Sequence, residues 1–266
     1  DLLCHGPIEK GLDATAGGVE FYNIGVDAAA FATVADSFAA LEQRVELDKR
    51  FGWREIYALV NSNWKGEAGK KARLIMKNSA RFGTGGSLAD SYASRISASF
   101  SRIVKKAPVS GAFIMIPGIF SWALVHVMGE KLGATPNGRY AGDPISQGAN
   151  PHPGFRKDGA ATALACAVAS IQPGYGNTAP LQIDLDPSFN NEEGKKVVES
   201  LIATHFDMGG TQINMNIVDA EQIIEAHKNP ELYPDLVVRV TGFSAYFANL
   251  SQELRQFVVD RIIQEN

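Results

Sequence analysis

The residue types that usually carry acid–base, nucleophilic or metal chemistry are scattered along this chain of 266 residues. Asp184 and Asp186 lie two apart in an alternating segment and so share one face of a strand, where paired acids could transfer protons or bind a cation. The step from Asp186 to Pro187 indicates a turn instead. The five histidines show no HExxH spacing and indicate no metal site. Cys4 and Cys166 form no metal-type cluster, and we interpret both as structural thiols.

A more specific signal surrounds Gly242, near the end of the chain. Residues 236–240 form an apolar, β-branched run typical of a strand, and residues 252–263 predict a helix that Ser251 caps. A glycine inside a strand pattern usually marks a bulge, a tight bend or a close backbone approach. Here, however, the segment Arg239-Val-Thr-Gly242-Phe243-Ser-Ala-Tyr-Phe247 resembles the glycyl radical motif found near the C-terminus of glycyl radical enzymes.

That resemblance implies that Gly242 carries a stored Cα radical, with Arg239, Phe243 and Ser244 supporting its loop. The family includes pyruvate formate-lyase, glycerol and diol dehydratases, choline lyase and arylacetate decarboxylases. A Cα radical is planar and delocalised into both flanking amides. A Cβ would crowd that centre and block a reacting sulfur, which is why glycine alone suits the role.

A second motif lies about a hundred residues upstream, where Gly133-Ala-Thr-Pro-Asn137-Gly138-Arg139 has strong turn chemistry. Proline fixes φ, and Asn137 and Gly138 both tolerate positive φ. The segment resembles the Gly-Ala-Thr-Pro-Asp-Gly-Arg signature of the same family, with Asn137 in place of the usual aspartate. Two independent motifs make a chance resemblance improbable.

The periodicity of apolar residues predicts an α/β fold of alternating helices and strands. Helices are expected near residues 27–47, 53–62, 66–79, 87–105, 159–170, 191–205 and 220–227, with strands at 112–116, 181–185, 211–219 and 236–240. In the first helix we expect Phe31, Val34, Phe38 and Leu41 to pack in the core. Asn190 or Asn191 is expected to cap the helix that runs to about His205.

The resemblance implies the second part of a ten-stranded α/β barrel, with a C-terminal glycine radical loop at its centre and a closing helix. Residues 1–180 would be the C-terminal part of the catalytic, pyruvate formate-lyase-like barrel domain, and residues 181–266 the glycine radical domain. In such a fragment, we expect the apolar residues of strands 112–116, 181–185 and 211–217 to be exposed along one side. The loop of Gly242 should be buried in a whole enzyme.

Phe120 and Trp122 are the candidates for a substrate pocket. Counted back from Gly133, they occupy places where resemblance to glycerol dehydratase puts a substrate-lining strand. Small-diol enzymes have a smaller residue where Trp122 stands, so the pocket is either filled for a small substrate or shaped for an aromatic one. Simple core packing is the alternative for both residues.

The resemblance also implies partners. A separate iron–sulfur, S-adenosylmethionine-dependent activase installs the radical, which passes to a cysteine that abstracts hydrogen from a small organic substrate. In eliminating members of the family, a glutamate follows this cysteine two residues later. Neither Cys4 nor Cys166 is followed in this way, so we expect the catalytic cysteine to be missing. The chain is then a C-terminal fragment, inactive alone, of an enzyme that forms a homodimer at full length.

Composition excludes some other classes of function. The net charge is −4 with no dense Lys/Arg run, which argues against a nucleic-acid surface. No apolar stretch approaches the ~20 residues needed to span a bilayer. With no visible secretory signal and only two cysteines, a cytoplasmic protein is expected.

Ser244-Ala245 after the Gly-Phe pair resembles the dehydratase, choline-lyase and decarboxylase branches, so elimination or C–C cleavage is the expected reaction. The resemblance implies an oxygen-sensitive lyase of anaerobic metabolism. Formate C-acetyltransferase and arylacetate decarboxylase activities stay open as alternatives. So do two functions of other classes, a detached radical-domain repair subunit and a non-catalytic α/β domain.

Overall fold

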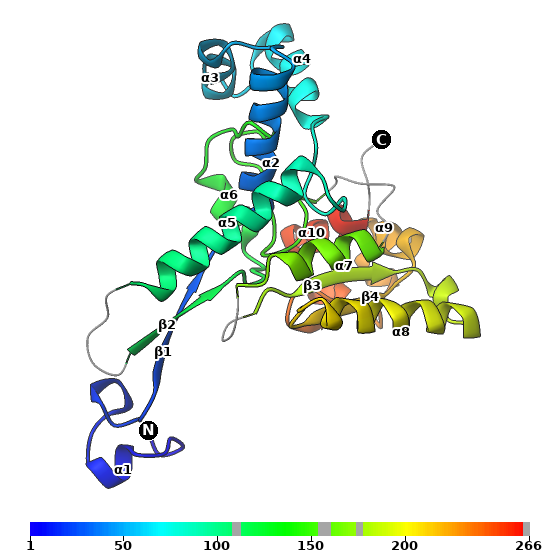
Figure 1. Cartoon of the computed structure of the whole chain (residues 1–266). Helices are drawn as coiled ribbons and strands as arrows, with labels where there is room; N and C mark the ends of the chain where they lie inside the picture. Colours follow the sequence, from blue (N-terminus) through cyan, green and yellow to red (C-terminus); the bar gives the residue numbers. More distant parts are fainter. Residues whose placement is uncertain (108–112, 154–160, 174–177, 263–266) are drawn as a thin grey trace.

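The structure, a computed structural model, describes residues 1–107, 113–153, 161–173 and 178–262. Residues 31–105 are mainly helical, and helices alternate with strands between residues 181 and 239 (Figure 1). The helices are α1 Pro7–Lys10, α2 Phe31–Leu41, α3 Trp53–Asn61, α4 Gly66–Lys77, α5 Leu88–Lys105, α6 Val125–Glu130, α7 Ala161–Ser170, α8 Glu192–Asp207, α9 Ala220–Lys228 and α10 Gln252–Ile262. The strands are β1 Tyr22–Asp27, β2 Phe113–Gly118, β3 Leu181–Leu185, β4 Ile213–Ile217, β5 Val237–Arg239 and β6 Ser244–Tyr246.

The strands pair in three separate ladders. Strand β1 runs parallel to β2 with Tyr22 opposite Phe113, and β3 runs parallel to β4 with Leu181 opposite Ile213. Strands β5 and β6 form an antiparallel hairpin. Helical crossovers join the parallel partners, as parallel pairing requires. The predicted α/β class is therefore confirmed.

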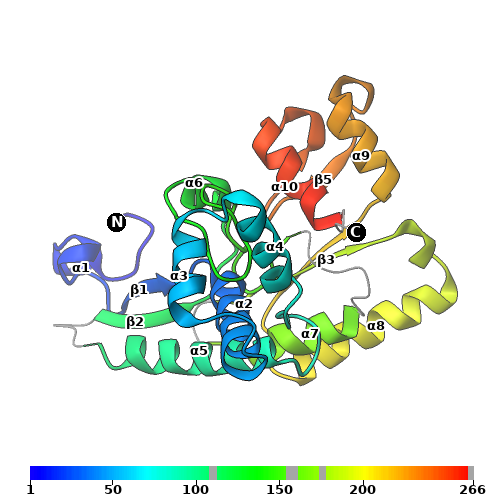
Figure 2. The same cartoon turned by 90° about the horizontal axis from the view of Figure 1, so that it is seen from above.

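The molecule is elongated rather than round. The β1–β2 ladder and α1 form an arm at one end, and α3 and α4 lie at another extremity (Figure 1). Helices α7 and α8 cover the β3–β4 ladder, and α9 and α10 gather beside β5 (Figure 2). This second group brings the hairpin next to the ladder of β3 and β4.

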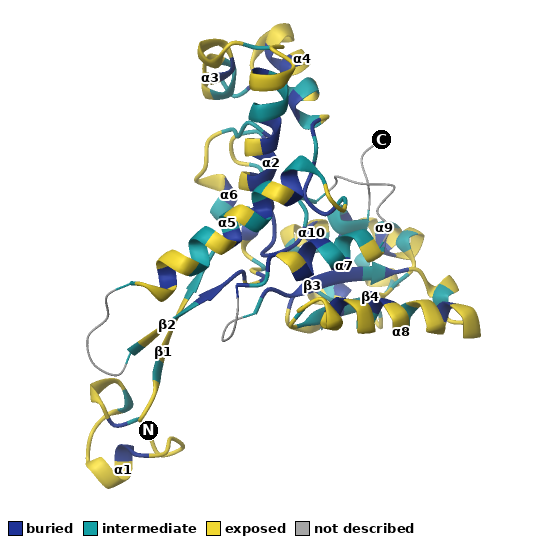
Figure 3. Cartoon of the chain, in the orientation of Figure 1, coloured by how far each residue is buried: buried dark blue, intermediate teal, exposed yellow. Residues whose placement is uncertain are grey.

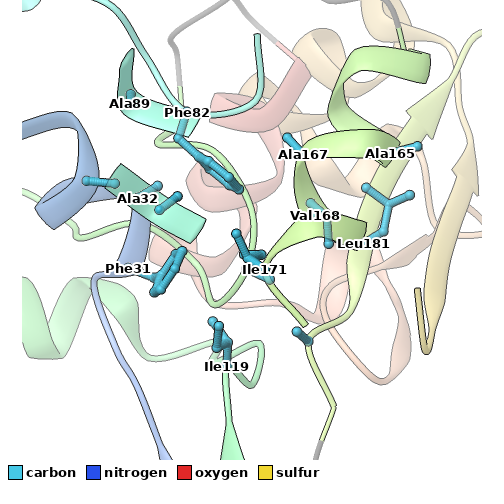
Figure 4. Packing of buried hydrophobic residues seen from close by; sticks show 14 of the residues in the cluster. Phe31, Ala32, Phe82, Ala89, Ile119, Ala165, Ala167, Val168, Ile171 and Leu181 are labelled. Carbon is cyan, nitrogen blue, oxygen red and sulfur yellow. The ribbon is translucent and has the colours of Figure 1, made fainter. Parts of the chain in front are cut away.

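The largest core lies between α2, α5, α7 and strand β3. Figure 4 shows Phe31, Phe82, Ile119 and Ile171 pointing into it. The small residues of α7 let this helix approach β3 closely, as its alanine-rich sequence predicted. A second core joins α9, α10 and the hairpin around Val240, Phe247 and Val258, and a third lies under α3 and α4.

Two details of the N-terminal region differ from the sequence prediction. Residues 22–27 form strand β1, whereas the sequence predicted no strand there and a helix from residue 27. The alternation of β1 is interrupted by Gly25, so its strand character comes from parallel pairing with β2. Ala30 adopts a left-handed conformation (φ 60°) and turns the chain into α2 at Phe31.

The predicted core face of α2 is wrong for two of its four residues. Phe31 is buried, but Val34 is exposed and Phe38 is 48% exposed, stacked on Tyr92 at 5.4 Å between ring centroids. The buried face consists of Phe31 and alanines such as Ala32, Ala35 and Ala39. The three alanines bury little surface each, so an apolar pattern of large residues points to the wrong side of this helix.

Exposure of the barrel strands follows the prediction only in part (Figure 3). Ile114 of β2 is exposed, and Ile217 of β4 is 59% exposed, as expected for strands of an incomplete barrel. Strand β3 contradicts the prediction, because Leu181, Ile183 and Leu185 are all buried in the largest core. Helices α7 and α8 cover the side of β3 that carries its apolar residues.

Candidate functional site

Gly242 lies at the tip of the β5–β6 hairpin. Arg239 pairs with Ser244 at the end of the ladder, and the N–H of Val240 donates to the carbonyl of Phe243 at 3.0 Å. Thr241 and Gly242 are therefore the two central residues of a tight connection. The predicted strand before the glycine is confirmed, and a short second strand follows it.

The turn does not itself require glycine at position 242. Gly242 is absent from the glycines whose φ falls in the left-handed region, and a Cβ built on it would meet no atom within 4 Å. Gly138 is the opposite case, with φ +91° and a Cβ position only 3.1 Å from the carbonyl of Arg73. Neither backbone strain nor crowding in this structure explains the glycine at 242.

Burial changes sharply across the tip. Val240 and Thr241 are buried, whereas Gly242, Phe243 and Ser244 are exposed. Arg239 is half-buried, and the hydrogen bonds described for it use its main chain. The limb before the glycine is thus fixed in the protein, while the glycine and the residues after it reach solvent.

Two side chains from other elements bind the limb before Gly242, and a third side chain joins these two. The Asn216 amide accepts from the N–H of Arg239 at 2.6 Å and donates to its carbonyl at 3.0 Å. Arg261 of α10 donates to the carbonyls of Val240 at 2.5 Å and Arg239 at 2.9 Å. Asp184 accepts from Asn216 at 2.6 Å and from Arg261 at 3.3 Å. Burial lowers the pKa of Arg261, and the Asp184 carboxylate partly opposes this shift.

Sequence reasoning did not single out Asn216 or Arg261. The alternation of β4 does place Asn214 and Asn216 on one face, opposite the apolar residues that face the core. Two amides on one face of a predicted strand were therefore a visible signal. Arg261 gave no such signal, because an arginine in the last turn of a helix is common.

The predicted acid pair on β3 is divided by the structure. Asp184 lies in the strand and faces Asn216 and Arg261. Asp186 caps a short 3-10 turn by accepting from the N–H of Ser188 at 2.8 Å. Hydrogen bonding with the side chain and the main chain of Ser188 lowers the pKa of Asp186. The turn interpretation of Asp186 is confirmed, and the two carboxylates do not act on one another.

The structure brings Phe120 and Trp122 together in the segment after β2. Their ring centroids lie 5.6 Å apart in an edge-to-face arrangement, and both side chains are about one-third exposed. Ser121 between them is buried. The pair lies just beyond the end of β2 rather than on the strand, since β2 ends at Gly118. Partial exposure leaves both aromatic side chains able to contact a further group.

The Gly-Ala-Thr-Pro-Asn-Gly-Arg segment is a firmly held turn. Asn137 accepts from the Thr135 hydroxyl at 2.6 Å and from the N–H of Arg139 at 3.3 Å, as a carboxylate in its place could. Arg73 donates to the carbonyl of Gly138 at 2.7 Å, and Arg81 to that of Asn137 at 2.6 Å. The motif therefore acts as a structural joint between α4 and the loop that follows α6.

A cavity of about 730 Å³ lies between this turn and helix α10. Its described lining includes Arg73, Arg139 and His152 on one side and Glu253 and Asp260 on α10. Gly242, Phe120 and Trp122 are not among those lining residues. Because cationic and carboxylate side chains both line the cavity, its lining does not select between anionic and cationic ligands.

Two ionisable groups near this turn, the buried Asp36 and the half-buried His152, have shifted pKa values. Burial raises the pKa of Asp36 to about 6, although its ion pair with Arg81 at 3.1 Å opposes the shift. Burial, together with the nearby charges of Arg81, Arg139 and Lys77, lowers the pKa of His152 to about 4. Both shifts follow from the packing of the turn, and neither group contacts the hairpin in the described structure.

Neither cysteine lies in the hairpin. Cys4 is exposed in the N-terminal arm, and Cys166 is half-buried in α7. Among the described residues, no group of three or more His, Cys, Asp or Glu side chains could hold a metal ion. Within the same residues, no helix has both the length and the apolar character needed to cross a membrane.

Comparison with known proteins matches two segments of the chain to two family models. A family model described as pyruvate formate lyase-like matches residues 1–129. The glycine radical family model matches residues 145–248 and so includes Gly242.

The curated relatives include dehydratases, lyases and a decarboxylase. Trans-4-hydroxy-L-proline dehydratase of Clostridioides difficile is 27% identical over 258 residues, which cover 97% of this chain and 32% of that protein. Isethionate sulfite-lyase of Oleidesulfovibrio alaskensis is 30% identical over 235 residues, covering 87% of this chain and 28% of that protein. The chain thus spans about a third of the length of these relatives.

Solved structures agree with this assignment. The glycerol-bound B12-independent glycerol dehydratase of Clostridium butyricum matches with a TM-score of 0.86 and 26% identity, over 97% of this chain and 33% of that one. A structure from Roseburia inulinivorans, described for 1,2-propanediol dehydration, matches with a TM-score of 0.89 and 26% identity. The predicted partial α/β barrel is confirmed, and the chain belongs to the glycyl radical enzymes.

Proposed function

We propose that Gly242 stores a Cα radical for a glycyl radical dehydratase or lyase. The observation that carries this proposal is that position 242 has no local structural need for glycine, since its φ is not left-handed and a Cβ would meet no atom. A planar radical stabilised by two flanking amides does need glycine there. Arg239, Phe243 and Ser244 are proposed to support the loop, Arg239 through its main chain.

The proposed reaction begins with a partner. A radical S-adenosylmethionine activase with an iron–sulfur cluster removes one hydrogen atom from the Gly242 Cα. The radical then passes to a thiol outside this chain, and the thiyl radical abstracts hydrogen from a small organic substrate. Elimination or C–C cleavage follows, which agrees with the dehydratase and lyase names of the relatives.

Other parts of the proposal concern the substrate and the assembly. We propose Phe120 and Trp122 as substrate-pocket residues, because their exposed edges stay available while Ser121 between them is buried. We also propose a domain division near residue 180, a homodimer at full length and a cytoplasmic location. The largest core contains residues from both sides of residue 180, among them Val168 and Leu181.

Electron paramagnetic resonance tests the radical assignment. Anaerobic treatment of the protein with a radical S-adenosylmethionine activase should give a doublet that is absent from Gly242→Ala. Gly133→Ala is a matched control, since its Cβ would also meet no atom within 4 Å and its φ is likewise not left-handed. The control should keep the doublet. A doublet of equal size in Gly242→Ala would refute the assignment.

A further inference from the structure

We propose that Asn216 and Arg261, joined through Asp184, are positioning residues that hold the hairpin of Gly242 in one place against strands β3 and β4. We call these three side chains the hairpin clamp. The hydrogen bonds alone support the claim that the clamp holds the hairpin in place. Its consequence for catalysis rests on the proposed function, because only a stored radical makes the exact position of Gly242 matter.

Asn216 substitutes for a neighbouring strand. Its side-chain amide uses its oxygen and its nitrogen to bind the N–H and the carbonyl of one residue, Arg239, at 2.6 and 3.0 Å. A strand partner makes the same two bonds with its main chain. Since β4 and β5 are not paired in a ladder, this amide joins the hairpin to the β3–β4 ladder.

Arg261 binds the same limb from helix α10. Its guanidinium donates to two successive carbonyls, those of Arg239 and Val240, and also to the Asp184 carboxylate. The Arg261 side chain is only 8% exposed and Asp184 only 14%, so water competes weakly for these charge-assisted bonds. A carboxylate from β3 thereby orients both an amide from β4 and a guanidinium from α10.

All the clamp bonds to the hairpin end at Arg239 and Val240, directly before Thr241 and Gly242. The residues after the glycine, Phe243 and Ser244, are exposed. One limb is therefore anchored and the tip projects from it. Passing a hydrogen atom between Gly242 and a thiol requires contact distance, so anchoring the limb sets where that transfer occurs.

Helix α10 supplies a matched control for this arginine. Arg255 lies on the same helix and also donates to carbonyls, those of Leu250 at 2.9 Å and Ala248 at 3.5 Å. These carbonyls follow the hairpin instead of preceding Gly242. Arg255→Met removes a comparable arginine from α10 without touching the clamp, whereas Arg261→Met removes the clamp arginine.

Hydrogen exchange of the 266-residue chain tests whether the clamp holds the hairpin in place. In Arg261→Met, the amides of Arg239, Val240 and Phe247 should exchange about tenfold faster or more, because hydrogen bonds to charged groups are lost locally. Exchange in α7 should not change, and Arg255→Met should leave the hairpin amides at the parental rate. In Arg261→Lys, which keeps the charge beside Asp184, the hairpin amides should exchange at a rate between those of Arg261→Met and Arg255→Met. Equal acceleration in Arg255→Met, or none in Arg261→Met and Arg261→Lys, would overturn the clamp.

Radical lifetime tests the consequence. After anaerobic activation, the doublet of Arg261→Lys should decay several-fold faster than that of the parent at the same hyperfine splitting, and Arg255→Met should match the parent. Identical decay in all three proteins would overturn the positioning role. If the parent itself gives no doublet, the proposed function fails, and the exchange experiment still decides whether the clamp holds the hairpin.

Discussion

Gly242 and Gly138 both lie in turns, but the backbone makes different demands on them. Gly138 has φ +91° and would bring a Cβ to 3.1 Å from both Arg73 and Lys77, whereas Gly242 meets neither restriction. We expect Gly138→Ala to lower the free energy of unfolding by about 1–3 kcal/mol and Gly242→Ala to change it by about 0.5 kcal/mol or less. Urea unfolding of both variants measures this difference. An equal loss in the two would mean that the turn needs glycine at 242 for structural reasons.

The stability of the protein should depend on His152 in mildly acidic solution. The native state resists protonation of this histidine, whose pKa falls from 6.5 to about 4, while the unfolded chain takes up the proton near pH 6.5. The stability that His152 contributes is therefore complete above pH 6.5 and is lost as the pH falls toward 4. The loss amounts to at most about 3 kcal/mol.

Comparison with His152→Gln isolates this contribution. The raised pKa of Asp36 changes stability in the opposite direction between pH 3.8 and about 6, but it is common to both proteins. The difference in free energy of unfolding between parent and variant should shift in favour of the variant as the pH falls. A difference independent of pH between about 4 and 7 would contradict the assignment of this shift to His152.

At the scale of elements, the cap of α8 is a choice that the sequence left open between Asn190 and Asn191. The structure assigns it to Asn191, whose side chain accepts from the N–H groups of Glu193 at 3.1 Å and Gly194 at 2.9 Å. Asn191→Ala should therefore lower the free energy of unfolding by about 1 kcal/mol, while Asn190→Ala serves as the neighbouring control and should change it little. Thermal melts of the two variants measure the difference. The reverse ranking would exclude Asn191 as the cap.

Prediction from sequence succeeded where a local sequence pattern favoured a single type of secondary structure. Helix α5 is one case, because Ser87 caps it by accepting from the N–H of Asp90 and the helix runs to Lys105 as expected. The limb before Gly242 is another, because β-branched residues favour a strand and the glycine ends the run. Local signals of this kind require no knowledge of distant neighbours.

Prediction failed where distant neighbours decide. Strand β1 depends on β2, which lies far along the chain, and the burial of α2 depends on alanines that carry little apolar signal. The clamp residues Asn216 and Arg261 lie on different elements and meet only at the hairpin. The glycine motif therefore identified the tip of the candidate site, while the side chains that hold it became visible only in three dimensions.

For the whole molecule, we expect no turnover from this chain alone. Radical transfer requires a thiol in contact with Gly242, but Cys4 lies in the N-terminal segment and Cys166 in helix α7, and neither belongs to the hairpin. Assays with activase against glycerol, propane-1,2-diol, choline and arylacetates should show no product. Addition of a polypeptide equivalent to the remainder of a relative should be needed for activity. Turnover by the chain that is lost in Cys4→Ala or Cys166→Ala would show that one of these is the reacting thiol.

The two parallel ladders have a consequence for handling this protein. In the described part of the chain each consists of two strands only, so each strand has an outer edge whose main-chain N–H and carbonyl groups have no neighbouring strand. Parallel sheets normally occur with both edges continued and both faces covered. Open edges with exposed side chains such as Ile24 and Ile114 invite pairing with other chains. The isolated chain is therefore expected to aggregate through these edges. Producing it together with a complementary polypeptide that pairs with the edges should keep it in solution.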